Sequence, residues 1–213
     1  MILKDFQNQK FSWITPRFIG ILFMICCATI ISFGGLIYRN FEDIEILEIV
    51  FFRSLALISY MGIFLCFKYK FNVFKNIRDI GVKGFFASAI FCSAQVSWLI
   101  ALDFTSVANA TFTLCLTPFI TALVAYVFVK EAISRVTCFT MVLALIGVSI
   151  MVFGGVKTNA NLGLISALYT SIAFSVFAVI LRSNRNLDML PVLLVTGLFM
   201  GAIGGVGGSF RIV

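Results

Sequence analysis

Arg53 is the only charged residue well inside one of the long apolar stretches of this chain, in the run LEIVFFRSLALI. An arginine at the centre of a membrane helix costs roughly 2.5–3.5 kcal/mol, and less near the interface, where its long side chain can reach the head groups. The guanidinium could therefore serve structure, by reaching the interface or by pairing with Glu48 or Asp103. It could instead face a cavity and attract an anionic or carboxylate-bearing solute. The sequence is compatible with both roles.

A second set of polar groups follows one face of the next apolar stretch. Ser88, Cys92, Gln95 and Trp98 are spaced by four, three and three residues, which keeps them close to one side of a helix. The Gln95 amide is expected near the middle of the membrane, where it needs a hydrogen-bonding partner. It would either join two helices or contact a solute beside the Trp98 ring. Trp98 would equally suit an anchor at the membrane interface.

The longest polar pattern lies in residues 105–129. Asn109, Thr113, Thr117 and Thr121 recur every four residues and form one stripe on a helix. Pro118 removes a backbone hydrogen bond near the middle and predicts a kink. Threonines often bond their own helix backbone, so helix packing is one interpretation. The stripe and the kink together favour a helix that lines a solute pathway, because such a backbone must face protein or water.

A further polar group occurs near residue 170, where Tyr169, Thr170, Ser171 and Ser175 fall near the centre of an apolar stretch. Tyr169 joins the candidate solute-contacting residues, although this stretch is a weaker candidate than Gln95 and Thr113. The full candidate set is Arg53, Gln95, Trp98, Asn109, Thr113, Thr117 and Tyr169, with Pro118 as the kink.

The elements that must position these residues are membrane-spanning helices. The chain is 61% hydrophobic, with 25 phenylalanines and a mean hydropathy of +1.09. No soluble domain of this length buries so many apolar side chains, so we predict an all-α polytopic membrane protein. About seven transmembrane helices are expected, over residues 18–38, 47–67, 80–102, 105–129, 134–153, 161–181 and 189–209.

The distribution of basic residues predicts an orientation. With residues 1–17 as a cytoplasmic N-terminal segment, twelve lysines and arginines lie inside, and only Arg39, Lys157 and Arg211 lie outside. The net charge of +7 is therefore interpreted as membrane orientation rather than nucleic-acid binding. The first apolar stretch has no clear cleavage site, which indicates a retained span. We expect a multi-pass protein of the cell inner membrane.

Several kinds of chemistry are not supported. There is no histidine, HExxH, GxSxG or pair of mid-membrane aspartates, so we predict no enzyme, no metal site and no cofactor. The six cysteines lie in or beside apolar stretches, and no disulfide framework is expected.

A weak internal repeat appears at an offset of 143 residues, which matches Gly20 with Gly163 and Arg39 with Arg182. Five spans separate the matched starts, so the second copy enters the membrane inverted, as in many secondary transporters. We expect one complete five-helix repeat over 18–153 and the start of an inverted one over 161–213, in a C-terminally truncated chain. The last span has glycine rows that suit close helix packing, and we expect it to need neighbours that this sequence lacks.

The run ALDFTSVANATFTLCLTPFITALVAYVFVKEAIS, residues 101–134, resembles EamA-type members of the drug/metabolite transporter superfamily. Thr117-Pro118, Glu131 and the early arginine Arg53 carry the resemblance, together with the glycine-containing stretch MVLALIGVSIMVFGG. The resemblance implies a ten-span fold of two inverted repeats, with a central cavity for amino acids, other metabolites or drugs, and alternating access. Three of those spans are absent here.

Two functions follow as hypotheses. The first is a secondary transporter of a small organic solute, amino-acid-like or anionic, with the solute and the lipid bilayer as its partners and no nucleic acid. The second is a membrane scaffold or assembly subunit, whose polar stripes only join helices. Both hypotheses are compatible with assembly as a homodimer.

Overall fold

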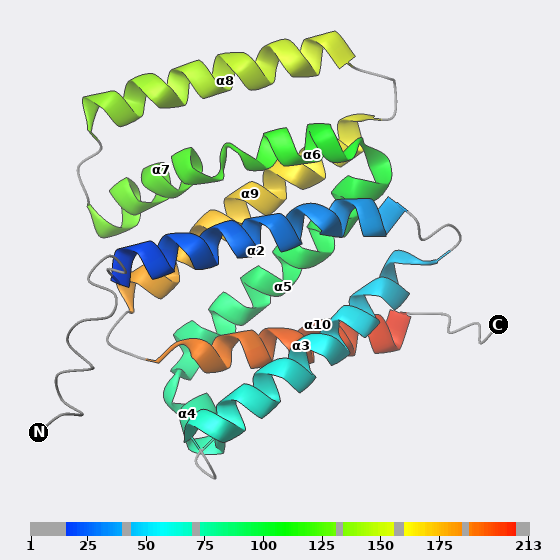
Figure 1. Cartoon of the computed structure of the whole chain (residues 1–213), viewed down its shortest axis with the longest axis vertical. Coiled ribbons are helices and arrows are strands. Elements are labelled where there is room, and N and C mark those ends of the chain that lie inside the picture. The colour runs from blue at the N-terminus through cyan, green and yellow to red at the C-terminus, as the bar shows by residue number, and fades with distance from the viewer. Residues whose placement is uncertain are drawn as a thin grey trace, which may run out of the picture. The chain divides into compact units, whose positions relative to one another are not determined.

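The computed structural model describes residues 16–39, 44–69, 73–130, 134–155, 160–184 and 188–207. Every secondary-structure element in these ranges is a helix (Figure 1). The chain divides into two compact units, Met1–Asp43 and Ile44–Val213, which are described separately. The expected N-terminal segment, residues 1–17, lies almost entirely outside the described residues.

The first unit contains a single described helix, α2 (Pro16–Arg39). None of its residues in Phe18–Gly35 is buried, although the segment is long and apolar enough to cross a membrane. Its two central hydroxyls bond their own helix, Thr29 to the Ile25 carbonyl at 2.9 Å and Ser32 to the Ala28 carbonyl at 2.8 Å.

The second unit contains all the other described helices. They are α3 (Ile46–Tyr69), α4 (Val73–Asp79), α5 (Gly81–Phe104), α6 (Val107–Leu114), α7 (Thr117–Val129), α8 (Arg135–Gly155), α9 (Ala160–Ser183) and α10 (Leu190–Gly207). Together with α2 of the first unit, six candidate spans among the described residues are long and apolar enough to cross a membrane, and α6 and α7 together form one of them. The described part of α8 adds a shorter apolar stretch, Arg135–Gly147. The predicted polytopic all-α fold is confirmed.

Helices α3 and α10 run antiparallel and pack backbone against backbone (Figure 1). A Cβ atom added at Gly204 would lie 2.8 Å from the Phe51 amide nitrogen and 2.9 Å from the Leu47 carbonyl oxygen. One added at Gly201 would lie 3.1 Å from the Ser54 hydroxyl. Only glycine allows helices to approach this closely. The expectation that the last span lacks neighbours is therefore wrong, because α3 covers its glycine face.

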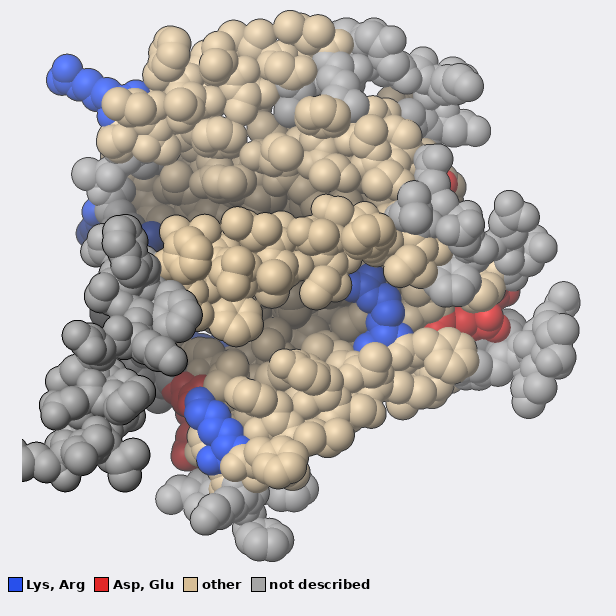
Figure 2. Space-filling model, viewed as in Figure 1, with Lys and Arg blue, Asp and Glu red and all other residues tan. Residues whose placement is uncertain are grey.

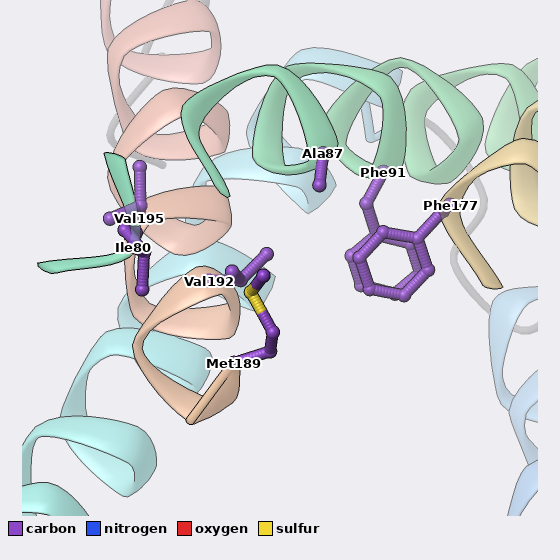
Figure 3. Close-up of a cluster of buried hydrophobic side chains, with 7 residues drawn as sticks. All are labelled: Ile80, Ala87, Phe91, Phe177, Met189, Val192 and Val195. Atoms are coloured by element: carbon purple, nitrogen blue, oxygen red, sulfur yellow. The ribbon is translucent and has the colours of Figure 1, made fainter. Parts of the chain in front are cut away.

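The apolar core of the second unit joins α5, α9 and α10 (Figure 3). The rings of Phe91 and Phe177 stack, with centroids 4.3 Å apart and an interplanar angle of 15°. Ser88 donates from α5 to the Val192 carbonyl of α10 at 3.0 Å. The residues of this core are Ile80, Ala87, Phe91, Phe177, Met189, Val192 and Val195.

Charged side chains are few on the described surface in Figure 2. One cluster joins the end of α3 to the residues before α10, where Lys68 Nζ lies 2.8 Å from Asp188 Oδ2. Tyr69 also donates to Oδ2, and Oδ1 accepts from the Leu190 amide at 3.2 Å. The single Asp188 carboxylate therefore caps the start of α10 and ties it to α3.

Candidate functional site

Arg53 and Gln95 meet between α3 and α5. Arg53 Nη2 donates to Gln95 Oε1 at 3.3 Å. The Arg53 side chain is exposed and Gln95 is half-buried. Neither carboxylate proposed from the sequence, Glu48 or Asp103, forms an ion pair with Arg53 in the structure. The guanidinium is thus held by a neutral amide, and most of its donors remain available.

Tyr169 belongs to a different contact, between α9 and another side of α5. Its hydroxyl donates to Ser93 Oγ at 3.0 Å. On the neighbouring face of α5, Ser97 donates to the Ser166 carbonyl at 2.9 Å, and Thr170 reaches the Ala94 carbonyl at 3.4 Å. These bonds join α5 to α9 over about one turn of each helix. Tyr169 is the exposed member of this group.

The polar stripe of residues 109–121 faces α9. Ser171 Oγ donates to the Thr113 carbonyl at 3.2 Å, and Ser175 Oγ donates to the Thr117 carbonyl at 3.1 Å. Thr121 donates in turn to Ser175 Oγ at 3.0 Å. The stripe therefore forms a hydrogen-bonded interface, which we call the hydroxyl ladder: Thr113, Thr117, Thr121, Ser171 and Ser175.

The predicted kink at Pro118 is a break between two helices. Helix α6 ends at Leu114, and α7 begins at Thr117 with Pro118 in its first turn. Across the break the backbone makes tighter bonds, including Leu116 N to the Thr113 carbonyl at 3.1 Å. Proline has no amide hydrogen for the carbonyl four residues back, so the helix cannot continue regularly there. The Thr113 carbonyl before the break and the Thr117 carbonyl after it both accept hydrogen bonds from serines of α9.

Thr117 has a hydroxyl with unused hydrogen-bonding capacity beside this break. Its Oγ1 atom is buried and has no hydrogen-bond partner within the described part of the chain. A buried hydroxyl without a partner carries a desolvation cost of about 1–3 kcal/mol. A water or a polar solute group at this position would remove that cost.

The predicted site residues thus fall into three places rather than one. Arg53 and Gln95 join α3 to α5, Tyr169 joins α9 to α5, and Thr113 and Thr117 lie in the hydroxyl ladder. Asn109 stays local, with its amide donating to Thr105 Oγ1 at 3.4 Å. Trp98 is half-buried on α5.

Sequence reasoning did not predict the helix-joining role of the α9 serines. Ser171 and Ser175 are fully buried and hold the broken span. Their spacing of four residues equals that of the threonine stripe, and this was the available signal. The Asp188 cluster was not predicted at all. Its only sequence signal is an aspartate two residues before an apolar stretch.

No group of three or more histidine, cysteine, aspartate or glutamate side chains that could hold an ion occurs among the described residues.

Comparison with known proteins identifies the family. The sequence matches the EamA-like transporter family over residues 18–153, well over half of the chain. This chain belongs to the EamA-like transporter family. No curated protein and no solved structure matches it significantly.

The family match covers α2 to α8 and includes both Arg53 and the hydroxyl-ladder residues of α6 and α7. As an EamA-like protein with several apolar spans, the chain is a multi-pass membrane protein of the drug/metabolite transporter superfamily. Transport rather than enzymatic catalysis is the activity that this family indicates.

Proposed function

We propose that the protein is a secondary transporter that moves a small organic metabolite across the inner membrane by alternating access. The observation that carries this proposal is membership of the EamA-like family over residues 18–153. We further propose that the N-terminus is cytoplasmic, on the strength of the basic-residue asymmetry. The solute would be amino-acid-like or anionic.

An inverted repeat gives such a transporter its two related conformations. The crossing of α3 and α10 supports the presence of such a repeat in this protein. At the offset of 143 residues, Ser54 is matched with Gly197, and Ile58 with Gly201. In the structure the partners are exchanged, since Ser54 contacts Gly201 and Ile58 contacts Gly197. A two-fold axis between the helices would produce this exchange.

This crossing also constrains how the protein could move. The backbones of α3 and α10 touch at Gly204, so the pair cannot slide or separate without losing its closest packing. We therefore propose that α3 and α10 form the fixed pivot of the transport cycle. The change of access would occur around α5, α6, α7 and α9, whose contacts include exchangeable side-chain hydrogen bonds as well as apolar packing.

The residues proposed to contact the solute are those that present polar groups between these helices. Arg53 and Gln95 would contact its polar or anionic end. The unpartnered Thr117 hydroxyl and the exposed Tyr169 would contribute further hydrogen bonds. Trp98, Asn109 and Thr113 remain candidates from the sequence.

The test is uptake by the purified full chain in liposomes of neutral lipid. A mixture of amino acids, organic acids and neutral metabolites is offered outside, and the contents are analysed by mass spectrometry. We expect protein-dependent, saturable accumulation of at least one solute, compared with protein-free liposomes. If no solute accumulates and none shifts thermal unfolding, the transporter hypothesis is wrong. The scaffold hypothesis then replaces it, and the hydroxyl ladder serves only to pack helices together.

A further inference from the structure

We propose that Arg53 and Gln95 form a carboxylate-binding subsite in which the Gln95 amide oxygen occupies the position that a solute carboxylate takes. The proposal rests on the proposed transport function and specifies how the solute is recognised. Four observations support it: the depth of the pair, the absence of a carboxylate partner among the described residues, the donor arrangement and the length of the Arg53–Gln95 contact.

The depth of the pair argues against a simple interfacial arginine. Arg53 lies seven residues after the start of α3, which is about 10 Å along the helix. Gln95 lies nine residues before the end of α5, or about 13 Å. The start of α3 and the end of α5 lie on the same side of the membrane, because these are consecutive spans linked by α4. The side chain thus reaches toward a deeper partner, not toward the nearer head groups.

Among the described residues, no carboxylate pairs with the guanidinium. Its only hydrogen-bond partner in that part of the chain is the Gln95 amide. An ionised group inside a membrane span is normally paired with an opposite charge or faces water. Because the Arg53 side chain is exposed, an anion that enters from a polar pathway can reach it.

The hydrogen-bonding groups match a carboxylate. Arginine has five N–H donors and no acceptor, so the amide oxygen of Gln95 must be the atom that faces it. The Gln95 NH₂ group then points away and can only donate. The pair therefore presents N–H donors without a free strong acceptor, and a planar guanidinium binds carboxylates through two parallel bonds. A neutral hydroxyl or amide satisfies fewer of these donors.

The existing contact is weak enough to be exchanged. At 3.3 Å it is longer than the 2.7–2.9 Å that is typical of hydrogen bonds between charged partners. A solute carboxylate would displace the Gln95 oxygen and accept from the guanidinium in its place. Binding would thereby break the direct Arg53–Gln95 link between α3 and α5, which couples solute recognition to the contact between the pivot helix and its neighbour.

Thermal unfolding of the full chain in a detergent with a neutral head group tests the proposal. The probes are propionate and benzoate, with propionamide and benzamide as uncharged matches and sodium chloride to equalise ionic strength. We expect the two carboxylates to raise the unfolding midpoint saturably and the two amides to leave it unchanged. Arg53→Gln should abolish this response, whereas Arg135→Gln, which changes an exposed arginine at the start of α8, should respond like the wild type.

Substitutions at Gln95 separate displacement from a purely structural bond. Gln95→Leu removes the internal competitor, so the half-saturating propionate concentration should fall about tenfold. Gln95→Glu supplies a permanent carboxylate, so the midpoint without ligand should rise and the propionate response should disappear. A Gln95→Glu protein that still responds to propionate like the wild type would overturn the proposal.

Failure of the subsite and failure of transport give different results. If neutral solutes accumulate in liposomes while no carboxylate shifts unfolding, the protein transports but the subsite is wrong. If propionate acts through Arg53 while no solute accumulates, the subsite stands and the transport function is wrong. If phosphatidylglycerol shifts unfolding through Arg53 and propionate does not, the arginine binds lipid head groups and the proposal is overturned.

Discussion

Two helix interfaces of this protein are packed in different ways. One is the α3–α10 crossing, and the other is the hydroxyl ladder between α9 and the broken α6–α7 span. At the crossing, α10 presents glycines, which have no side chain beyond the Cα atom, and Gly204 therefore lies against backbone atoms of α3. In the ladder, serine hydroxyls of α9 donate to the Thr113 and Thr117 carbonyls, which lie on the two sides of the break. Close packing at the crossing allows only one arrangement of the two helices. In the ladder, by contrast, a hydroxyl can exchange its protein partner for a water or a solute. In the transport cycle that we propose, the first contact would stay fixed while the second is rearranged.

The largest predicted effect breaks the fixed contact. Gly204→Ala places a Cβ within 2.9 Å of two backbone groups of α3, which cannot move without shifting the helix. We expect a loss of about 3 kcal/mol in the free energy of unfolding, measured by denaturation in mixed micelles. Gly205→Ala is the matched control, since its Cβ would meet only the Phe51 ring at 3.6 Å. Equal losses in the two variants would show that the crossing is not closely packed in the membrane.

A smaller effect is expected from the adjustable contact. Ser175→Ala removes the donor to the Thr117 carbonyl and the acceptor for Thr121. Hydrogen bonds between membrane helices contribute about 0.6 kcal/mol on average and at most about 1.7. We therefore expect a loss of about 1 kcal/mol in the same unfolding assay.

Ser149→Ala is the control for the ladder, because that hydroxyl is exposed on α8 and bonds the Leu145 carbonyl of its own helix. It should change the unfolding free energy by less than about 0.5 kcal/mol. If Ser175→Ala costs as much as Gly204→Ala, the ladder is as rigid as the crossing, and the distinction between pivot and moving part fails.

The smallest effect concerns Asp188, at the end of the fixed pair. Burial is the largest single influence and raises the pKa of its carboxyl, but the hydrogen bonds from Lys68, Tyr69 and the Leu190 amide together outweigh it and hold the pKa below its ordinary value of 3.8. Its stabilising contribution is therefore complete above that value and is lost as the pH falls through the lowered pKa. The side chain is 41% exposed, so the effect is small and is screened by salt.

This dependence is measured as the difference in unfolding midpoint between the wild type and Asp188→Asn as the pH is lowered from neutral. The difference should shrink below pH 3.8 and should also shrink in high salt. A difference that stays constant across the acid range would mean that Asp188 stabilises only as a helix cap.

The membrane spans could be predicted closely because hydropathy records them directly. The stretch expected at 47–67 forms Ile46–Tyr69, and that expected at 161–181 forms Ala160–Ser183. The short helix α4 was not predicted, because seven residues carry too little periodic signal. Gly81 follows it with a φ of +59°, the left-handed conformation that lets the chain turn into α5.

The pairing of helices could not be predicted, since it depends on residues that are distant in sequence. The glycine rows of α10 indicated close packing, but nothing in the sequence named α3 as the partner. Likewise the threonine stripe was interpreted as a pathway lining, and the serines that cover it lie more than 50 residues later, on α9. Arg53 was found because a charge in an apolar span is conspicuous, whereas its contact with Gln95 required the structure.

The crossing of α3 and α10 has a consequence for biosynthesis. Gly204 meets Phe51 across about 150 residues of chain. At about 5–20 residues per second, a ribosome completes α3 roughly 10–30 s before it finishes α10. Throughout that interval the Ser54 face of α3 lacks its glycine partner. The earliest moment at which the second unit can close is therefore set by the arrival of its last described helix, and earlier release from the insertion machinery would leave that face to mispair.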